Sequence, residues 1–101
     1  MAEKITKAVF EQKIQNDEKV VIIDFYADWC GPCKMLAPIL DEVSEENKDV
    51  EIYKVNVDEE SDLARQFGVA SIPTVVSFKS GKEHKRVIGV RDKDSLIEEL
   101  V

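Results

Sequence analysis

The sequence predicts an α/β domain in which a mixed β-sheet carries helices on both faces. Three observations lead to this prediction. The segment Val20–Tyr26 is apolar on both alternating faces except at Asp24, which is typical of a central strand covered on both sides. Segments with helical periodicity alternate with such strands along the chain. Near the C-terminal end, Ser80-Gly81 joins two strand-like segments and indicates a β-hairpin.

Length and composition limit the class of protein. The chain has 101 residues, 44% of them hydrophobic and 35% charged, so residues 1–101 are expected to form one domain with a core that needs no metal or disulfide. The net charge of −7 opposes non-specific binding to nucleic acid. The longest aliphatic run, Val20–Ile23, is far shorter than the ~20 residues of a membrane-spanning helix.

The first helix is expected over Lys7–Gln15. Thr6 can cap its N-terminus, and a short strand near Ile5 can precede it. Three apolar residues recur near one face of this helix: Val9, Phe10 and Ile14. The central strand Val20–Tyr26 follows.

The middle of the chain predicts a long helix, a strand and a short helix. The long helix begins near Cys30 and ends about Asn47. Glu51–Val57 alternates between apolar and polar residues and indicates a strand. Ser61–Phe67 predicts a short helix that Gly68 ends.

The C-terminal part predicts a hairpin and a last helix. The hairpin strands are Thr74–Lys79 and Lys82–Ile88. A small basic cluster in the second strand (Lys82, Lys85 and Arg86) is typical of a charged edge strand that discourages strand addition. Asp92 can cap the final helix. That helix carries the apolar residues Leu96, Ile97, Leu100 and Val101.

The N-terminal segment contains no secretory signal. Its longest apolar run is Ala8–Phe10, much shorter than a secretory hydrophobic region. A cytoplasmic location is therefore expected, although a mature form with its targeting segment removed would look the same.

The two cysteines carry the clearest chemical signal. They lie in Trp29-Cys30-Gly31-Pro32-Cys33, where the central strand gives way to the long helix. The unpaired amides and the dipole of a helix N-terminus favour a thiolate at Cys30. A fall in a thiol pKa from ~8.5 to ~7 makes about half of it thiolate at neutral pH. Cys33 follows one turn later, and Pro32 suits an early helical position because its missing donor would be unpaired there.

Three other interpretations of the cysteines compete. A structural disulfide over so short a loop stabilises little through chain entropy, and cytosolic disulfides are seldom structural. A structural zinc site usually has four ligands. The chain offers only His84 besides the two cysteines, so carboxylates or a second chain would have to complete it. Two inert buried thiols would not explain the helix start or the Gly-Pro between them.

A series of motifs extends over nearly the whole chain. They are Asp24-Phe25-Tyr26-Ala27, Trp29-Cys30-Gly31-Pro32-Cys33-Lys34-Met35, Ala37-Pro38, Lys54-Val55-Asn56-Val57-Asp58, Ile72-Pro73-Thr74, Phe78-Lys79-Ser80-Gly81 and Gly89. In these motifs the chain resembles the thioredoxin family. The Trp-Cys-Gly-Pro-Cys core is highly specific in this context, whereas Cys-x-x-Cys alone would be weak.

The resemblance implies a thioredoxin fold, a central mixed sheet flanked by four helices, and general reduction of protein disulfides. In the implied mechanism Cys30 attacks a substrate disulfide, and Cys33 resolves the mixed disulfide to leave an oxidised Cys30–Cys33 pair. The chain would bind no cofactor or metal. Its partners would be disulfide-containing proteins and a flavin-containing thioredoxin reductase that supplies electrons from NADPH, and the protein would be a monomer. Two residues depart from many bacterial members, which have Trp at Tyr26 and Gly at Ser71.

Asp24 interrupts the apolar central strand. A buried carboxylate is costly, and burial raises its pKa. It could be a satisfied core aspartate or a carboxylate at the strand edge; the resemblance favours a proton acceptor for Cys33. Lys54, on the neighbouring strand, would then lie near Asp24 and modulate its ionisation.

Ile72-Pro73 precedes a strand. The sequence alone favours an ordinary trans proline there, whereas the resemblance implies a cis bond that places the Ile72 backbone opposite the cysteines, where an extended substrate could pair with it. The resemblance also implies an apolar docking patch made of Trp29, Gly31, Pro32, Ile72, Pro73 and Gly89.

Two alternative functions stay open. An oxidant or isomerase on the same fold would be a strongly oxidising couple, although Gly-Pro between the cysteines resembles reducing thioredoxins. A binding module would keep its function after both cysteines become serine.

Overall fold

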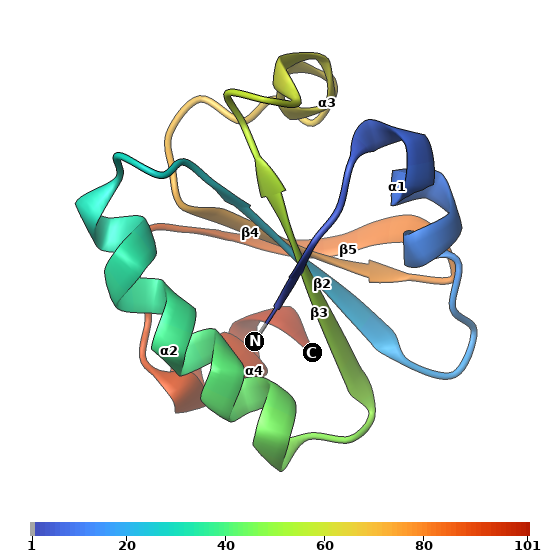
Figure 1. Ribbon diagram of the computed structural model, residues 1–101. Coiled ribbons are helices and arrows are strands. Elements are labelled where there is room, and N and C mark those ends of the chain that lie inside the picture. Colours follow the sequence, from blue (N-terminus) through green and yellow to red (C-terminus); the bar gives the residue numbers. More distant parts are fainter. Residues whose placement is uncertain (1) are drawn as a thin grey trace.

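A five-stranded mixed sheet forms the centre of the protein, and two helices cover each of its faces (Figure 1). The computed structural model describes residues 2–101. The strands lie in the order β1-β3-β2-β4-β5. The elements in chain order are β1 (Glu3–Lys4), α1 (Lys7–Ile14), β2 (Val20–Tyr26), α2 (Gly31–Glu46), β3 (Val50–Asn56), α3 (Ser61–Gln66), β4 (Thr74–Lys79), β5 (Lys82–Ile88) and α4 (Lys93–Leu100). The predicted fold class is confirmed.

The central strand β2 is parallel to β3 and antiparallel to β4. Strand β1 adds to β3 in parallel, as the expected short strand near Ile5, and β5 completes the hairpin with β4. Both turn residues have positive φ, +50° at Ser80 and +81° at Gly81. A turn of two residues in the left-handed backbone conformation matches the right-handed twist of the flanking strands. The hairpin predicted at Ser80-Gly81 is therefore confirmed.

Residues of β2 alternate between two separate cores. Ile23 faces a core shared with α1 and α3, whereas Ile22 faces a core shared with α2 and α4. Four phenylalanines form a connected ring cluster in the first core, with ring centroids 5.2 to 6.1 Å apart: Phe10, Phe25, Phe67 and Phe78. Because Asp24 is on the same face as Ile22, it lies on the side of the sheet that α2 covers.

The first helix begins differently from the prediction. Thr6 occupies the N-cap position, but its side chain accepts no capping hydrogen bond. Instead, the Lys7 N–H donates to Glu60 Oε1 at 2.9 Å, from a residue that directly precedes α3. The helix ends at Ile14, one residue earlier than expected, and β3 begins and ends one residue earlier as well. These boundaries depend on long-range partners that local signals do not contain.

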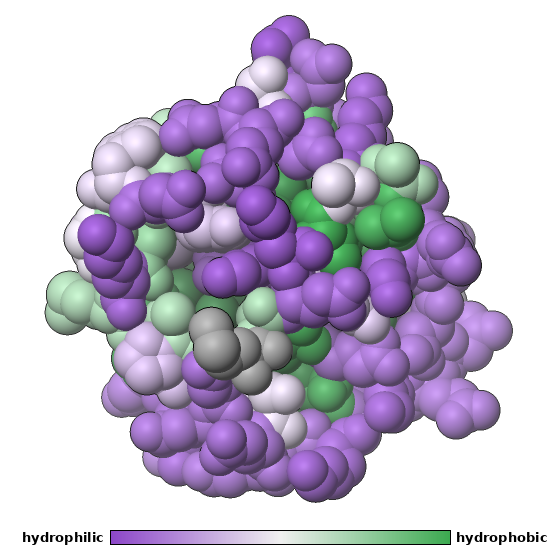
Figure 2. All heavy atoms as spheres, in the orientation of Figure 1, coloured by the Kyte–Doolittle hydropathy of each residue, from purple (hydrophilic) through white to green (hydrophobic). Residues whose placement is uncertain are grey.

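The outer surface is mainly hydrophilic on the face seen in Figure 2, with hydrophobic atoms showing between the helices.

Strand β5 is an edge of the sheet, as its basic cluster predicts, and Arg86 forms an ion pair with Glu83 at 3.0 Å. Within residues 2–101, no helix is long and apolar enough to cross a membrane.

Candidate active site

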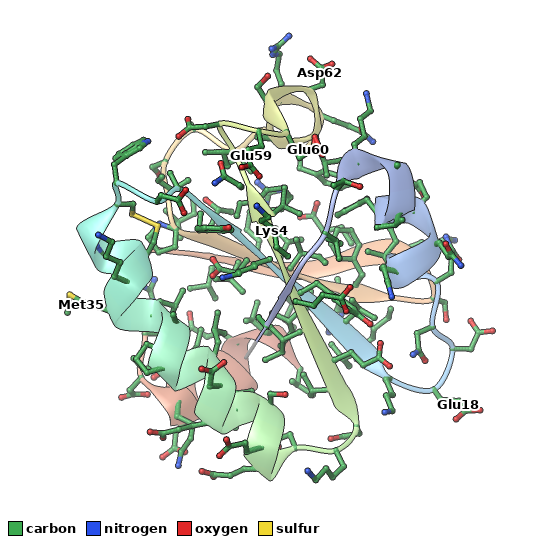
Figure 3. All side chains as sticks on the ribbon, viewed as in Figure 1. Lys4, Glu18, Met35, Glu59, Glu60 and Asp62 are labelled. Carbon is green, nitrogen blue, oxygen red and sulfur yellow. A yellow bond between two sulfur atoms is a disulfide. The ribbon has the colours of Figure 1, made fainter. Side chains whose placement is uncertain are left out.

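Cys30 and Cys33 form a disulfide at the start of α2, seen as the yellow bond in Figure 3. Cys30 is the N-cap residue, in an extended conformation, and the Cys33 N–H donates to Cys30 Sγ at 3.2 Å. Pro32 lies in the first turn, where no donor is required. The sequence therefore places Cys30 Sγ where the helix amides point.

This position favours negative charge on Cys30 Sγ once the disulfide is reduced. The N-terminal amides and the helix dipole stabilise an anion, and the Cys33 N–H already points at the sulfur. Each cysteine is only 4% exposed. The chemistry that this arrangement supports is reversible formation of a disulfide between adjacent thiols.

The loop before β4 approaches the disulfide from the other side. The Ile72–Pro73 peptide bond is cis, and the Ile72 carbonyl oxygen is 3.9 Å from Cys30 Sγ. The Pro73 carbonyl accepts a hydrogen bond of 2.8 Å from the Gly89 N–H. Gly89 has φ +91°, a conformation that favours glycine. The structure thus brings the Ile72 carbonyl beside Cys30 and links the adjoining Pro73 to Gly89.

The predicted docking residues differ in exposure. Trp29 is 70% exposed, and both Gly31 and Pro32 are exposed at the helix start. Ile72 is half-buried, whereas Pro73 is buried and bonded to Gly89. A shallow groove runs beside these residues and is lined by Trp29, Val57, Val69, Ala70, Ser71 and Ile72.

Asp24 lies behind Cys33. It is 4% exposed, and Oδ1 has no hydrogen-bond partner. Asp24 and Cys33 line one cavity of about 170 Å³, which Lys54 also lines, and Lys54 is the register partner of Asp24 on β3. Burial raises the pKa of Asp24 to about 7, and the positive charge of Lys54 opposes that rise. The predicted burial and the predicted proximity of Lys54 are both observed.

Two further residues, Asn56 and Asp58, organise the site, although no sequence pattern predicted a role for them. The Trp29 indole Nε1–H donates to Asp58 Oδ2 at 2.8 Å. Buried Asn56 accepts hydrogen bonds from the N–H groups of Asp58, at 2.8 Å, and Glu59, at 3.2 Å. An asparagine at the end of an alternating strand, two residues before an aspartate, is a signal for such a turn.

A zinc site would need ligands besides the two cysteines. His84 is exposed on β5, and residues 2–101 contain no group of three or more histidine, cysteine or acidic side chains that could hold a metal ion.

Comparison with known proteins gives consistent matches over most of the chain. The thioredoxin family profile matches residues 1–101. A thioredoxin of Rickettsia felis is 41% identical over 99 residues, covering 97% of this chain and 94% of the relative. A thioredoxin of Chlamydia caviae is 56% identical over 78 residues, covering 77% of this chain and 76% of the relative.

Solved structures agree with these matches. A mutant thioredoxin from Halobacterium salinarum has a TM-score of 0.88 at 36% identity, covering 96% of this chain and 85% of that one. Oxidised mitochondrial thioredoxin 3 from Saccharomyces cerevisiae has a TM-score of 0.87 at 36% identity, covering 96% of this chain and 91% of that one.

The cysteine pair and these matches define the class of protein: a disulfide oxidoreductase that works by dithiol–disulfide exchange at Cys30 and Cys33. The chain belongs to the thioredoxin family.

Proposed function

We propose that this protein is a general reductase of protein disulfides, with Cys30 as the nucleophile and Cys33 as the resolving thiol. The Cys30 thiolate attacks one sulfur of a substrate disulfide. That S–S bond breaks, the first substrate thiolate leaves, and a mixed disulfide joins Cys30 to the substrate. Cys33 then loses its proton and attacks Cys30 Sγ, which releases the second substrate thiolate. The protein ends with a Cys30–Cys33 disulfide, having given two electrons to the substrate.

One observation carries this assignment of roles: Cys30 Sγ accepts the Cys33 N–H at the N-cap of α2. Only the N-cap sulfur receives this stabilisation as an anion, so Cys30 is the better nucleophile near neutral pH. Cys33 lies inside the first turn, one helical turn from Cys30, and is placed to displace the captured substrate.

Asp24 is proposed to accept the proton of Cys33, and Lys54 to modulate the ionisation of Asp24. The shared cavity of Asp24 and Cys33 supports this role, because one or more water molecules could relay the proton between them. A proton acceptor with a pKa of about 7 is also well matched to neutral conditions.

Substrates are proposed to dock on the patch of residues around Cys30. An extended segment would pair with the Ile72 backbone. The exposed Trp29 ring would cover its apolar side chains, and Gly89 would leave room for its backbone. The full proposed set is Trp29, Gly31, Pro32, Ile72, Pro73 and Gly89.

The wider setting is proposed on the family relationship. Residues 1–101 would act as one monomeric domain in the cytoplasm. A flavin-containing thioredoxin reductase would return the pair to the dithiol with electrons from NADPH, and the chain itself would bind no cofactor. The net charge of −7 supports protein substrates rather than nucleic acid.

An insulin-reduction assay with dithiothreitol tests the proposal. We expect the wild-type protein to accelerate insulin precipitation, and Cys30→Ser and Cys33→Ser both to lose turnover. Cys33→Ser should accumulate a mixed disulfide at Cys30, whereas Cys30→Ser should not. Retained turnover in either variant would contradict the dithiol mechanism. A binding module would keep its partner after both substitutions, and a strongly oxidising equilibrium with glutathione would favour the oxidant or isomerase.

A further inference from the structure

The Lys54 ammonium rests on an aromatic ring instead of contacting the buried carboxylate opposite it. Lys54 and Asp24 are register partners on β3 and β2, and Tyr26 follows Asp24 on the same face of β2. The Lys54 Nζ lies 5.0 Å from the centroid of the Tyr26 ring, within cation–π range. Among residues 2–101, no ion pair within 4.0 Å joins Lys54 to Asp24. Asp24 Oδ1 meanwhile has no hydrogen-bond partner.

The neighbouring cation on β1 is held separately. Lys4 is the register partner of Lys54 on its other side, and its Nζ forms an ion pair with Glu59 at 3.0 Å. Both residues are labelled in Figure 3. The Glu59 carboxylate is therefore the ion-pair partner of the Lys4 ammonium. The Tyr26 ring is the aromatic partner of Lys54, and Asp24 is the buried carboxyl group on the neighbouring strand.

Charged side chains from the loop before α2, from α2 and from β3 line the cavities next to Asp24. Its partner on β4 is the apolar Val75. The remaining charged groups that line its two adjoining cavities are Asp28 before α2, Lys34 and Asp41 on α2, and Lys54 on β3. Lys34 is exposed on the first turn of α2, so solvent screens its charge more than that of half-buried Lys54.

We propose that Tyr26 is a positioning residue that holds the Lys54 ammonium on its ring and so prevents a contact ion pair between Lys54 and Asp24. The proposal rests on the proposed role of Asp24 as the proton acceptor for Cys33. A contact ion pair would stabilise the carboxylate and make it a weak base at neutral pH. With Lys54 on the ring, its charge acts on Asp24 only through space. Asp24 then remains basic enough to accept the proton of the Cys33 thiol.

The ring is suited to this role because it stays uncharged. The ordinary pKa of a tyrosine hydroxyl is 10.0 and burial raises that of Tyr26 further. The hydroxyl is therefore protonated at neutral pH, and the ring face attracts a cation. The hydroxyl itself is not required for the cation–π contact. Phenylalanine should therefore replace Tyr26 in this role, whereas leucine should not.

The test is an NMR titration of the Asp24 carboxyl carbon in the oxidised protein, where neither cysteine titrates and the carboxyl is not coupled to a thiol. We expect Tyr26→Phe to leave the Asp24 pKa close to wild type. Tyr26→Leu should lower it by roughly half a pH unit or more, because Lys54 can then pair with Asp24. Tyr53→Leu is the matched control, since Lys13 lies 5.2 Å from the Tyr53 ring, a cation–π contact that does not involve Lys54.

A Lys54→Met background separates this effect from simple hydration. Removal of the ring also admits water to Asp24. This hydration lowers the Asp24 pKa by itself, whether or not Lys54 is present. We expect Tyr26→Leu to shift the Asp24 pKa clearly less when Lys54 is absent. Equal shifts in both backgrounds, or a Tyr26→Phe shift as large as that of Tyr26→Leu, would overturn the proposal.

Stopped-flow measurement of the resolving step distinguishes this proposal from the proposed function. We expect the pH midpoint of that step to follow the Asp24 pKa in the Tyr26 variants. If the Asp24 pKa moves as expected and the resolving step does not follow, the role of Tyr26 in placing Lys54 stands, and the role of Asp24 as proton acceptor fails.

Discussion

The Trp29 indole Nε1–H donates a 2.8 Å hydrogen bond to Asp58 Oδ2, which ties the loop before Cys30 to the turn after β3. Asn56, at the end of β3, fixes that turn by accepting the Asp58 N–H. A ring that is 70% exposed would otherwise be free to rotate beside the cysteines. The contact therefore holds the largest apolar side chain of the proposed docking patch in one orientation.

Loss of this contact should be visible in tryptophan fluorescence, because Trp29 is the only tryptophan of the chain. We expect Asp58→Ala to give faster local depolarisation of Trp29 and a higher KM for protein substrates, since one hydrogen bond of about 1 kcal/mol is lost. Asp58→Asn keeps an acceptor oxygen and serves as the control. Identical anisotropy decays in wild type and Asp58→Ala would show that the bond does not restrain the ring.

Asp24 should make the stability of the fold depend on pH. Its pKa is about 7 in the folded protein against an ordinary value of 3.8, so the folded state binds this proton more tightly. The Asp24 contribution to stability is therefore most favourable at low pH and declines as pH rises from 3.8 to about 7.

Asp24→Asn should remove that penalty. We expect the variant to be more stable than wild type by on the order of 4 kcal/mol at about pH 8, and the difference to vanish near about pH 4. Urea denaturation across this range measures it. A variant less stable than wild type at the higher pH would contradict the burial of an unpartnered carboxylate.

Gly89 and Gly31 should differ in their response to alanine. Gly89 has φ +91°, where a Cβ is strained, so Gly89→Ala should cost roughly 1–2 kcal/mol of unfolding free energy. Gly31 is the first helical residue of α2, and a Cβ there would meet nothing within 4 Å. Gly31→Ala should leave stability unchanged or slightly higher. Equal losses in thermal denaturation would argue against a special backbone requirement at Gly89.

The two predicted N-caps should also differ. Asp92 accepts the Ser95 N–H at 2.8 Å, and this bond lowers the pKa of Asp92. Asp92→Ala should lower the thermal midpoint by a few degrees at neutral pH, and the loss should shrink as acid protonates the carboxyl. Thr6 makes no such bond, so Thr6→Ala should have little effect. A drop as large for Thr6→Ala would show that its hydroxyl caps α1 in solution.

These pairs illustrate what the sequence could predict. The Asp92 cap, the Ser80-Gly81 hairpin and the helix start at Cys30 are set by residues within one turn of each other, so local patterns were sufficient. The position of Lys54 opposite Asp24 was expected from the resemblance and follows the strand register.

The remaining features depend on contacts between distant segments. Glu60 caps α1 from 53 residues away, in place of Thr6. Asn56 and Asp58 were part of a recognised motif, but the bond from Trp29 to Asp58 exists only once two loops meet. The position of Lys54 on the Tyr26 ring likewise depends on side-chain conformation rather than on spacing.

The proposed mechanism requires Cys30 to be the ionised nucleophile at the start of α2. The most direct test is the rate of alkylation of the reduced protein by iodoacetamide as a function of pH, with the modified cysteine identified by peptide mass spectrometry. We expect preferential alkylation of Cys30 with an apparent pKa of about 7. Titration of the reactive thiol near about 8.5, as for a free cysteine, or preferential alkylation of Cys33, would contradict it.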